Sequence, residues 1–293
     1  MTLSIIIVTY YSYDLIKDCI DSIYINNNIG DGNLEIIIVE NSDEQESERL
    51  RQFIYLVYGN KIKFVKNDNL GYGQGNNVGI KISTGDIITI MNPDVLVTVP
   101  IFSRVIKTFS KMPKLALLGG RQFGRKNISY YIRPEKEIHF ITLFLMIILN
   151  RINVFNSKYM FPSGAFLFIR KEAFEAIGLF DEKMFLYCEE PDITERFLRA
   201  GYSVRYDKKL PYQHLIDDRD DLSDYSFKEA LISTEYYFNK FSYNFKFFIK
   251  QKIFSYKLML FFAKMSGNKK LQNKFKTTGD KFLSFYNNKF MKK

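Results

Sequence analysis

A short apolar run that stops at a proline constrains this chain more than any other feature. Residues 87–91 read Ile-Ile-Thr-Ile-Met, an apolar and mostly β-branched run that is typical of a strand buried on both faces. Asn92, Pro93 and Asp94 follow directly, and the strand must end there because proline has no N–H for a sheet ladder. Asp94 is therefore expected just beyond the carboxyl end of a central strand, where open α/β sheets bind ligands. The alternative is an ordinary strand-ending turn, in which Asn, Pro and Asp are common.

Similar runs alternate with helix-like segments before and after this strand. Because parallel strands need crossover connections, the alternation predicts right-handed βαβ units and a mainly parallel sheet, which is the α/β fold class. A Gly- and Asn-rich loop at residues 67–79 is expected to lead into a short helix before residue 87. The other predicted strands are residues 3–9, 35–39, 61–66, 115–118, 165–169 and 202–206.

The positive charge of the chain is concentrated near its end. The net charge is +10, and residues 241–293 contain 13 Lys and one Asp, a balance of +12, so residues 1–240 carry −2. This break predicts a main domain at residues 1–216 and a helical, basic extension at residues 217–293. Lysines and aromatic residues recur in the extension at near-helical spacing, which is typical of amphipathic helices on an anionic membrane surface. A nucleic-acid surface is the alternative, but residues 225–293 contain no arginine and no nucleic-acid motif, so we expect no nucleic-acid partner.

Two further features bear on where the protein acts. The two cysteines, Cys19 and Cys188, provide no disulfide framework, and the first residues lack the basic region and cleavage site of a signal peptide. We therefore expect a cytoplasmic protein that binds the inner face of the cell membrane peripherally. Residues 138–149 are apolar, but they fall well short of the ~20 residues that span a bilayer. A buried helix and a membrane-facing loop both fit this segment.

The common nucleotide-binding fingerprints do not fit the chain. A Rossmann dinucleotide site needs Gly-x-Gly-x-x-Gly directly after the first strand, but residues 9–14 contain no glycine. Gly71 and Gly73 come much later, and Asn76 stands where the third fingerprint glycine would fall. The chain also has no Walker A sequence.

Several segments in order resemble glycosyltransferase family 2. The first two strands read Ser-Ile-Ile-Ile-Val-Thr-Tyr-Tyr-Ser (4–12) and Glu-Ile-Ile-Ile-Val-Glu-Asn-Ser-Asp (35–43). The Gly/Asn-rich segment 69–79 and the segment 84–95, which contains Asn-Pro-Asp, resemble the family's loop and metal motif. Segments similar to its acceptor-side signature follow at 163–165, 178–182 and 185–193, and Gly201-Tyr202 and His214 complete the order. The resemblance covers about residues 3–216 and implies a GT-A fold.

The resemblance implies an inverting, metal-dependent transfer of a sugar from a nucleotide-sugar donor. The diphosphate leaving group gains charge that a divalent cation neutralises, and Mn²⁺ and Mg²⁺ both prefer oxygen ligands. Asp94 is the expected metal ligand, and His214 matches a late histidine that can complete the metal shell. Asn92 stands where the family often has an aspartate, so we expect it at the donor rather than on the metal.

An inverting transfer also needs a base that takes the proton from the acceptor hydroxyl. Glu189, Glu190 and Asp192 lie at the start of a predicted helix, where their mutual repulsion raises a carboxyl pKa and the helix N-terminus lowers it. Three capping acids without a catalytic role are the alternative. The resemblance places Glu190 at the base position, with Glu189 and Asp192 as the other candidates.

The donor itself is expected at the ends of the first strands. Glu40 stands where the family has an aspartate that contacts the nucleotide base, and Tyr11 replaces an asparagine, so its ring is expected to stack on the base. The remaining expected donor contacts are Thr9, Asn69, Gly71, Asn77, Asn92, Asp94 and Gly164.

The sequence therefore predicts a glycosyltransferase of bacterial surface-polysaccharide synthesis. The Asn-Pro-Asp motif most resembles rhamnosyltransferases, which implies rhamnose from dTDP-rhamnose as the transferred sugar and a lipid-linked saccharide as the acceptor. The basic extension would provide a peripheral membrane contact, and an oligomer is compatible with the sequence. The alternatives are a UDP-hexose-using transferase of the same family and a membrane-associated nucleotide-sugar-binding protein without turnover.

Overall fold

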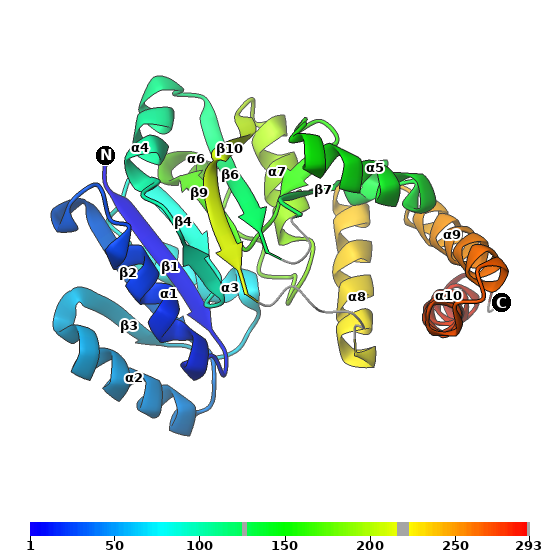
Figure 1. Cartoon of the computed structure of the whole chain (residues 1–293), viewed down its shortest axis with the longest axis horizontal. Coiled ribbons are helices and arrows are strands. Elements are labelled where there is room, and N and C mark those ends of the chain that lie inside the picture. The colour runs from blue at the N-terminus through cyan, green and yellow to red at the C-terminus, as the bar shows by residue number, and fades with distance from the viewer. Residues whose placement is uncertain (125–127, 216–222, 292–293) are drawn as a thin grey trace.

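The computed structural model describes residues 1–124, 128–215 and 223–291, and a mixed sheet lies at its centre (Figure 1). Among these residues the sheet has eight strands in the order β3-β2-β1-β4-β9-β6-β10-β5. Its strands are β1 (Leu3–Thr9), β2 (Leu34–Glu40), β3 (Ile62–Lys66), β4 (Ile87–Met91), β5 (Val95–Val97), β6 (Leu115–Phe123), β9 (Phe166–Arg170) and β10 (Ser203–His214). A separate ribbon pairs β7 (Tyr130–Ile132) with β8 (Met160–Pro162).

Most neighbouring strands are parallel, so the predicted α/β class is confirmed. β1 pairs in parallel with β2 and β4, β2 with β3, and β6 with β10. β9 is the exception at the centre, because it runs antiparallel to both β4 and β6. β5 runs antiparallel to β10 at the edge. β9 therefore joins two parallel groups of strands into one sheet.

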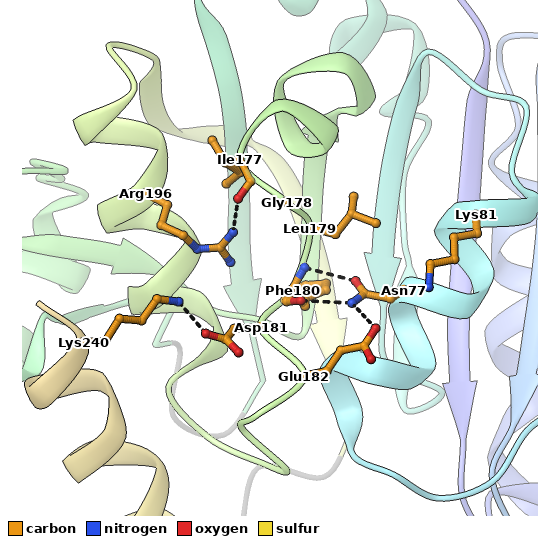
Figure 2. A pocket seen from close by; sticks show the side chains of 10 residues that line it. All are labelled: Asn77, Lys81, Ile177, Gly178, Leu179, Phe180, Asp181, Glu182, Arg196 and Lys240. Atoms are coloured by element: carbon orange, nitrogen blue, oxygen red, sulfur yellow. Dashed lines mark hydrogen bonds and ion pairs between the residues drawn. The ribbon is translucent and has the colours of Figure 1, made fainter.

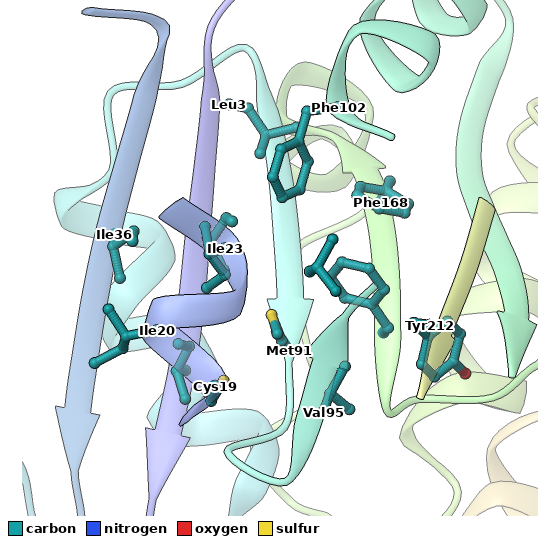
Figure 3. Close-up of a cluster of buried hydrophobic side chains, with 14 of the residues drawn as sticks. Leu3, Cys19, Ile20, Ile23, Ile36, Met91, Val95, Phe102, Phe168 and Tyr212 are labelled. Atoms are coloured by element: carbon teal, nitrogen blue, oxygen red, sulfur yellow. The ribbon is translucent and has the colours of Figure 1, made fainter. Parts of the chain in front are cut away.

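Helices cover both faces of the sheet because its strands are apolar on both sides. Ile5 and Ile7 of β1 belong to one buried cluster, together with residues of α1 (Tyr13–Ile25), α2 (Glu44–Tyr58) and α4 (Phe102–Lys111). Figure 3 shows part of this cluster. Ile6 and Val8 belong to the other cluster, with α3 (Tyr72–Ile82), α6 (Lys171–Ala176) and α7 (Glu189–Arg199). The alternation of side chains along one strand thus builds both layers.

The Gly- and Asn-rich segment is mostly helical, so the predicted loop at residues 67–79 is wrong. α3 begins at Tyr72, and its glycines lie against the sheet. A Cβ at Gly79 would approach the Ile6 side chain to 2.6 Å, and one at Gly75 would lie 3.1 Å from Val8. The glycines therefore let α3 pack closely on β1, a tertiary benefit that outweighs their low helix propensity.

The basic extension forms the predicted helices, α8 (Asp224–Lys240), α9 (Phe245–Met265) and α10 (Lys269–Phe290). In Figure 1, α8 stands between the sheet and the α9–α10 pair. A third buried cluster combines side chains of these helices, such as Phe238, with Met184 and Cys188 of the segment before α7. Lys240 of α8 also pairs with Asp181 and Asp192. α8 is therefore packed into the rest of the fold, and the predicted boundary between residues 216 and 217 lies outside the described residues.

The apolar segment predicted at 138–149 forms α5 (His139–Ile152), and it is neither a buried helix nor a loop. Thr142 is its one buried residue, while Ile141, Phe144 and Ile148 are each more than half exposed. Among the described residues, no helix is both long enough and apolar enough to cross a membrane.

Removal of a large side chain from the third cluster should destabilise the whole protein. Phe238 is 2% exposed and its ring contacts Tyr243, Phe245 and Phe248. Phe238→Ala should lower the free energy of unfolding by about 3–5 kcal/mol in one cooperative denaturant transition, because a large buried ring is lost. Tyr225→Ala, at a 62% exposed position on the same helix, is the matched control. A separate early transition that leaves the main one unchanged would contradict the integration of α8 with the sheet.

Candidate active site

Thr9 and Glu40 are polar residues at the carboxyl ends of β1 and β2. Thr9 Oγ1 donates a 2.5 Å hydrogen bond to Glu40 Oε2, and the Ser42 N–H donates a 2.6 Å bond to Glu40 Oε1. Thr9 and Glu40 are fully buried. Both oxygens of Glu40 are thus held by the protein, and its predicted contact with the nucleotide base stays a prediction.

Two exposed tyrosines follow β1 directly. Tyr11 has a φ of 48°, and its hydroxyl donates a 2.7 Å hydrogen bond to Asp43 Oδ2 at the start of α2. Its ring lies edge-on to that of Tyr10, with 4.8 Å between the ring centroids. Both side chains are more than half exposed. This pair is therefore a ready surface for a planar ligand to stack on.

Asp94 meets His214 where β5 pairs with β10. The backbone N–H of Leu215 donates to the Asp94 carbonyl at 2.9 Å, and His214 Nε2 lies 3.2 Å from Asp94 Oδ2. Asp94 is 9% exposed, and neither its Oδ1 nor His214 Nδ1 has a hydrogen-bond partner among the described residues. Buried polar atoms are almost always paired, so these two atoms suit a ligand. Oxygen and imidazole donors of this kind fit Mn²⁺ or Mg²⁺.

The protein alone supplies few metal ligands at this point. Among residues 1–124, 128–215 and 223–291, no cluster of three or more His, Cys, Asp or Glu side chains could hold a metal ion. A cation bound by Asp94 and His214 would therefore need further oxygens, and a diphosphate group provides such oxygens.

The acidic residues at the start of α7 follow a strained bend. Tyr187 and Cys188 both have positive φ, 74° and 69°, a conformation that costs of order 1–3 kcal/mol for a non-glycine residue. Gly71, with φ of 119°, lies directly against this segment, since a Cβ there would be 2.7 Å from the Phe185 carbonyl oxygen. The Tyr72 N–H donates to the same carbonyl at 2.9 Å. Because Gly71 has no side chain, the backbone of α3 can approach the bend and hold it through the Tyr72 N–H. The predicted contact of Gly71 with the donor stays a prediction.

Backbone pairing brings the acidic residues to the metal motif. The Asn92 N–H donates to the Ala165 carbonyl at 2.9 Å, which extends the antiparallel pairing of β4 with β9. The neighbouring Gly164 lies against Glu190, because a Cβ at Gly164 would stand 1.9 Å from Glu190 Oε1. Asn92 and Glu190, about a hundred residues apart in the sequence, therefore both lie next to residues 164–165.

Tyr72 interacts with both Asn92 and Glu190, and the sequence had not predicted a role for it. Its hydroxyl donates a 2.9 Å hydrogen bond to Asn92 Oδ1. Burial raises the pKa of Tyr72, and the negative charges of Glu190, Glu189 and Asp94 raise it further. The phenol therefore keeps its proton and acts as a neutral donor. In the sequence, Tyr72 is marked only by its position between two glycines. Because this segment was predicted as a loop, the role of Tyr72 could not be inferred.

Glu189 and Asp192 have different surroundings. Burial raises the pKa of Glu189 well above its ordinary value, and the charges of Glu190 and Asp192 act in the same direction. Asp192 is fully buried and binds Arg196 of its own helix and Lys240 of α8. Asp192 therefore takes part in an ion-pair network that joins two helices, and its predicted role as a catalytic acid stays a prediction.

Two of the other predicted donor contacts have different surroundings, and their roles stay predictions. Figure 2 shows Asn77 at a cavity of about 520 Å³, where its amide binds Phe180 and Glu182. This cavity lies against α3 and α7, and Asp94 and Glu190 do not line it. Asn77 thus fastens the segment before the acidic residues, whereas Asn69 is exposed in the loop before α3.

A comparison with protein families identifies the chain. Residues 4–178, more than half of the chain, match the family model described as glycosyl transferase family 2. The chain belongs to this family. The match begins in β1 and extends beyond the Asn92–Asp94 motif and Gly164, so it includes the strand ends described above.

Several curated relatives of this family member are glycosyltransferases. An uncharacterised glycosyltransferase of Rickettsia typhi is 27% identical over 73% of this chain and 64% of its own length. The low-salt glycan biosynthesis hexosyltransferase Agl10 of Haloferax volcanii is 28% identical over 69% of this chain and 63% of its own. The rhamnosyltransferase WbbL of Escherichia coli is 22% identical over 72% and 81%, respectively. The chain thus spans less than two thirds of the length of the first two.

A solved structure confirms the GT-A-type fold. The mannosyltransferase PcManGT of Pyrobaculum calidifontis, solved with GDP-Man and Mn²⁺, superposes with a TM-score of 0.60 at 15% identity. The similarity covers 99% of this chain and 88% of that one, so it includes the C-terminal helices. At this identity the likeness concerns the fold.

A methyl group at Gly164 should displace the candidate base. In Gly164→Ala the new Cβ would occupy the place of the Glu190 carboxylate, a flexible group that can move without unfolding the protein. Turnover of the nucleotide-sugar donor should fall by roughly 10²-fold or more, the usual share of a positioned acid or base, while the melting temperature changes little. The control is Gly32→Ala, where a Cβ meets no atom within 4 Å. Full activity of Gly164→Ala would separate Glu190 from the reaction.

Glu189 should make the stability of the protein depend on pH. Its pKa in the folded protein lies above the ordinary 4.5, so the folded state binds more protons than the unfolded state between these values. Wild-type stability should therefore fall as the pH rises through that window. Glu189→Gln should be more stable than wild type at alkaline pH, and the difference should shrink towards pH 4.5 in denaturant titrations without metal. The exposed Glu44→Gln is the control, and a pH-independent difference would refute the buried proton.

Proposed function

We propose that this protein transfers a sugar, with inversion, from a nucleotide-sugar donor to a saccharide acceptor with the help of Mn²⁺ or Mg²⁺. The observations that support the proposal are that Asn92, paired with Ala165, and Glu190, packed against Gly164, lie next to the same two residues, and that the nearby Asp94 has an oxygen without a partner among the described residues. The chain belongs to glycosyl transferase family 2, and the transferase activity, the metal, the sugar and the acceptor are our proposals.

Each polar group has a separate task in this proposal. Asp94 and His214 would hold the cation, which when bound neutralises the charge that develops on the diphosphate leaving group. Glu190 takes the proton of the acceptor hydroxyl as that oxygen attacks the anomeric carbon. Glu189, more deeply buried, keeps its own proton and thereby avoids a second negative charge beside Glu190.

Tyr72 and the tyrosines after β1 would position the donor. Tyr72 fixes the Asn92 amide through its hydroxyl, so the Asn92 N–H₂ group can donate to a donor substrate. Tyr10 and Tyr11 provide a stacking surface for the nucleotide base, and Glu40 supports the strand ends beneath them through Thr9 and Ser42.

We favour rhamnose from dTDP-rhamnose as the transferred sugar. The relative named rhamnosyltransferase and the Asn-Pro-Asp motif support it, whereas the relative named hexosyltransferase supports a UDP-hexose donor as the alternative. The acceptor would be a lipid-linked saccharide at the cytoplasmic face of the membrane, where the lysine-rich extension would contact anionic lipid. A nucleotide-sugar-binding protein without turnover is the competing function.

Nucleotide binding should depend on Asp94 and on the metal. A thermal-shift screen of nucleoside diphosphates should show the largest rise in melting temperature with dTDP and Mn²⁺, because a ligand at 100 times its Kd adds about 2.7 kcal/mol of stability. In Asp94→Asn the Mn²⁺-dependent part of this rise should disappear. Asp18→Asn, on the exposed face of α1, is the control.

The same samples then separate the competing functions. Release of sugar from dTDP-rhamnose or a UDP-hexose supports the transferase, and the preferred donor distinguishes the two sugars. Binding without release supports the protein that lacks turnover. A metal response that is the same in Asp94→Asn and wild type would remove Asp94 from the metal site.

A further inference from the structure

α5 presents a continuous apolar stripe to solvent. Its exposed residues Ile141, Phe144, Leu145, Ile148 and Ile152 follow a spacing of 3, 1, 3 and 4, which puts them on one side of a helix. Four of the five are more than half exposed. An apolar stripe of this size on a surface helix indicates an interaction site for another protein surface or for a membrane.

α9 carries a second stripe with lysines along its edge. Phe247, Phe254, Phe261 and Met265 are each more than half exposed and recur at intervals of seven, seven and four residues, so they share one side of the helix. The exposed lysines of this helix recur at intervals of four, seven and seven residues and lie on the neighbouring strip; they are Lys246, Lys250, Lys257 and Lys264.

Aromatic rings join the two stripes into one surface. The Phe140 ring stacks on that of Phe262 with 5.9 Å between centroids, and it also contacts the exposed Phe144 at 5.6 Å. Phe262 in turn contacts the exposed Phe261 at 5.7 Å. An unbroken line of rings thus runs from α5 to α9, and we call the two stripes together the α5–α9 surface.

A polar cluster locks the two helices in this arrangement. The side chain of Gln251 receives the His139 N–H and donates to the Glu137 carbonyl, at 2.8 and 2.7 Å. Lys252 Nζ lies 2.7 Å from Glu137 Oε1. Burial alone would raise the pKa of Glu137, but Lys252 and His139 lower it to about 2, so the ion pair persists at neutral pH. The surface is therefore preformed.

We propose that the α5–α9 surface docks on an anionic lipid bilayer, with the apolar stripes in the interface and the lysines at the headgroups. Neither helix contains an acidic residue, and α10 adds six lysines against one aspartate. Apolar residues bordered by lysines match the acyl boundary and the phosphate layer of a membrane. A symmetric second copy fits poorly, because a two-fold axis would set lysine against lysine without a carboxylate on either helix.

The surface adjoins the acceptor side of the site, and this part of the inference rests on the proposed function. α5 is anchored to β7, since Asn150 Nδ2 donates to the Tyr130 carbonyl and Tyr130 Oη to the Leu149 carbonyl. β7 pairs with β8, and β8 ends at Pro162, two residues before Gly164 and the Glu190 carboxylate. A bilayer beneath α5 would therefore lie on the side from which a lipid-linked acceptor approaches Glu190.

Vesicle flotation of the full chain tests the proposal. Wild type should float with vesicles that contain phosphatidylglycerol, less so with phosphatidylcholine alone, and less at high salt. Phe144→Ser with Ile148→Ser should lower the vesicle partition coefficient by roughly tenfold or more, because two exposed apolar side chains are lost. Leu56→Ser with Val57→Ser, a pair exposed on α2, is the matched control and should float as wild type does. Phe254→Ser on α9 should also lower flotation, which tests the second stripe independently.

The possible outcomes separate this inference from the proposed function. Unchanged flotation of both variants overturns the docking surface, and so does a concentration-dependent dimer that the Phe144/Ile148 variant abolishes without any vesicle binding. Donor turnover in solution should stay the same in all variants, since none of these residues belongs to the groups proposed to bind the donor or the metal or to take the proton. Loss of flotation in a protein that turns over no donor would uphold the docking surface and refute the transferase mechanism.

Discussion

The antiparallel pairing of β9 with β4 is the constraint on which the site depends. It continues past the strands through the Asn92–Ala165 hydrogen bond, so the end of one strand and the beginning of the other share one point. Gly164 directly precedes Ala165, and because it has no side chain it leaves room for the Glu190 carboxylate. β9 lies between the two parallel groups of strands. The residues just before it therefore contact both Asn92, at the end of β4, and Glu190, at the start of α7.

The acidic residues need support because their backbone is strained. Two consecutive positive φ values at Tyr187 and Cys188 persist only if the surroundings outweigh the cost. That support comes from both sides. Tyr72 holds the Phe185 carbonyl from α3, while Ser233 of α8 donates to the Leu186 carbonyl. α8 therefore helps to shape the site, and α9 forms the α5–α9 surface together with α5.

Prediction from the sequence worked best where a pattern concerns a single element. β-branched runs reliably indicated the strands, and the acids before residue 193 indicated the start of a helix. It could not show which distant partners a residue meets in the fold. Asp192 resembles a third catalytic acid, but Lys240 reaches it from α8. Asn77 resembles a donor contact, but its amide is used by Phe180 and Glu182.

The sequence by itself determined the order of strands and helices, the family, and the chemical types brought to the site, because these depend on local periodicity and short motifs. Only the tertiary structure decided that Tyr72 binds Asn92, that Asp192 pairs with Arg196 and Lys240, and that α5 faces outward. These properties arise from contacts between segments far apart in the chain. A run of apolar residues has the same appearance in the sequence whether the fold covers it or leaves it exposed.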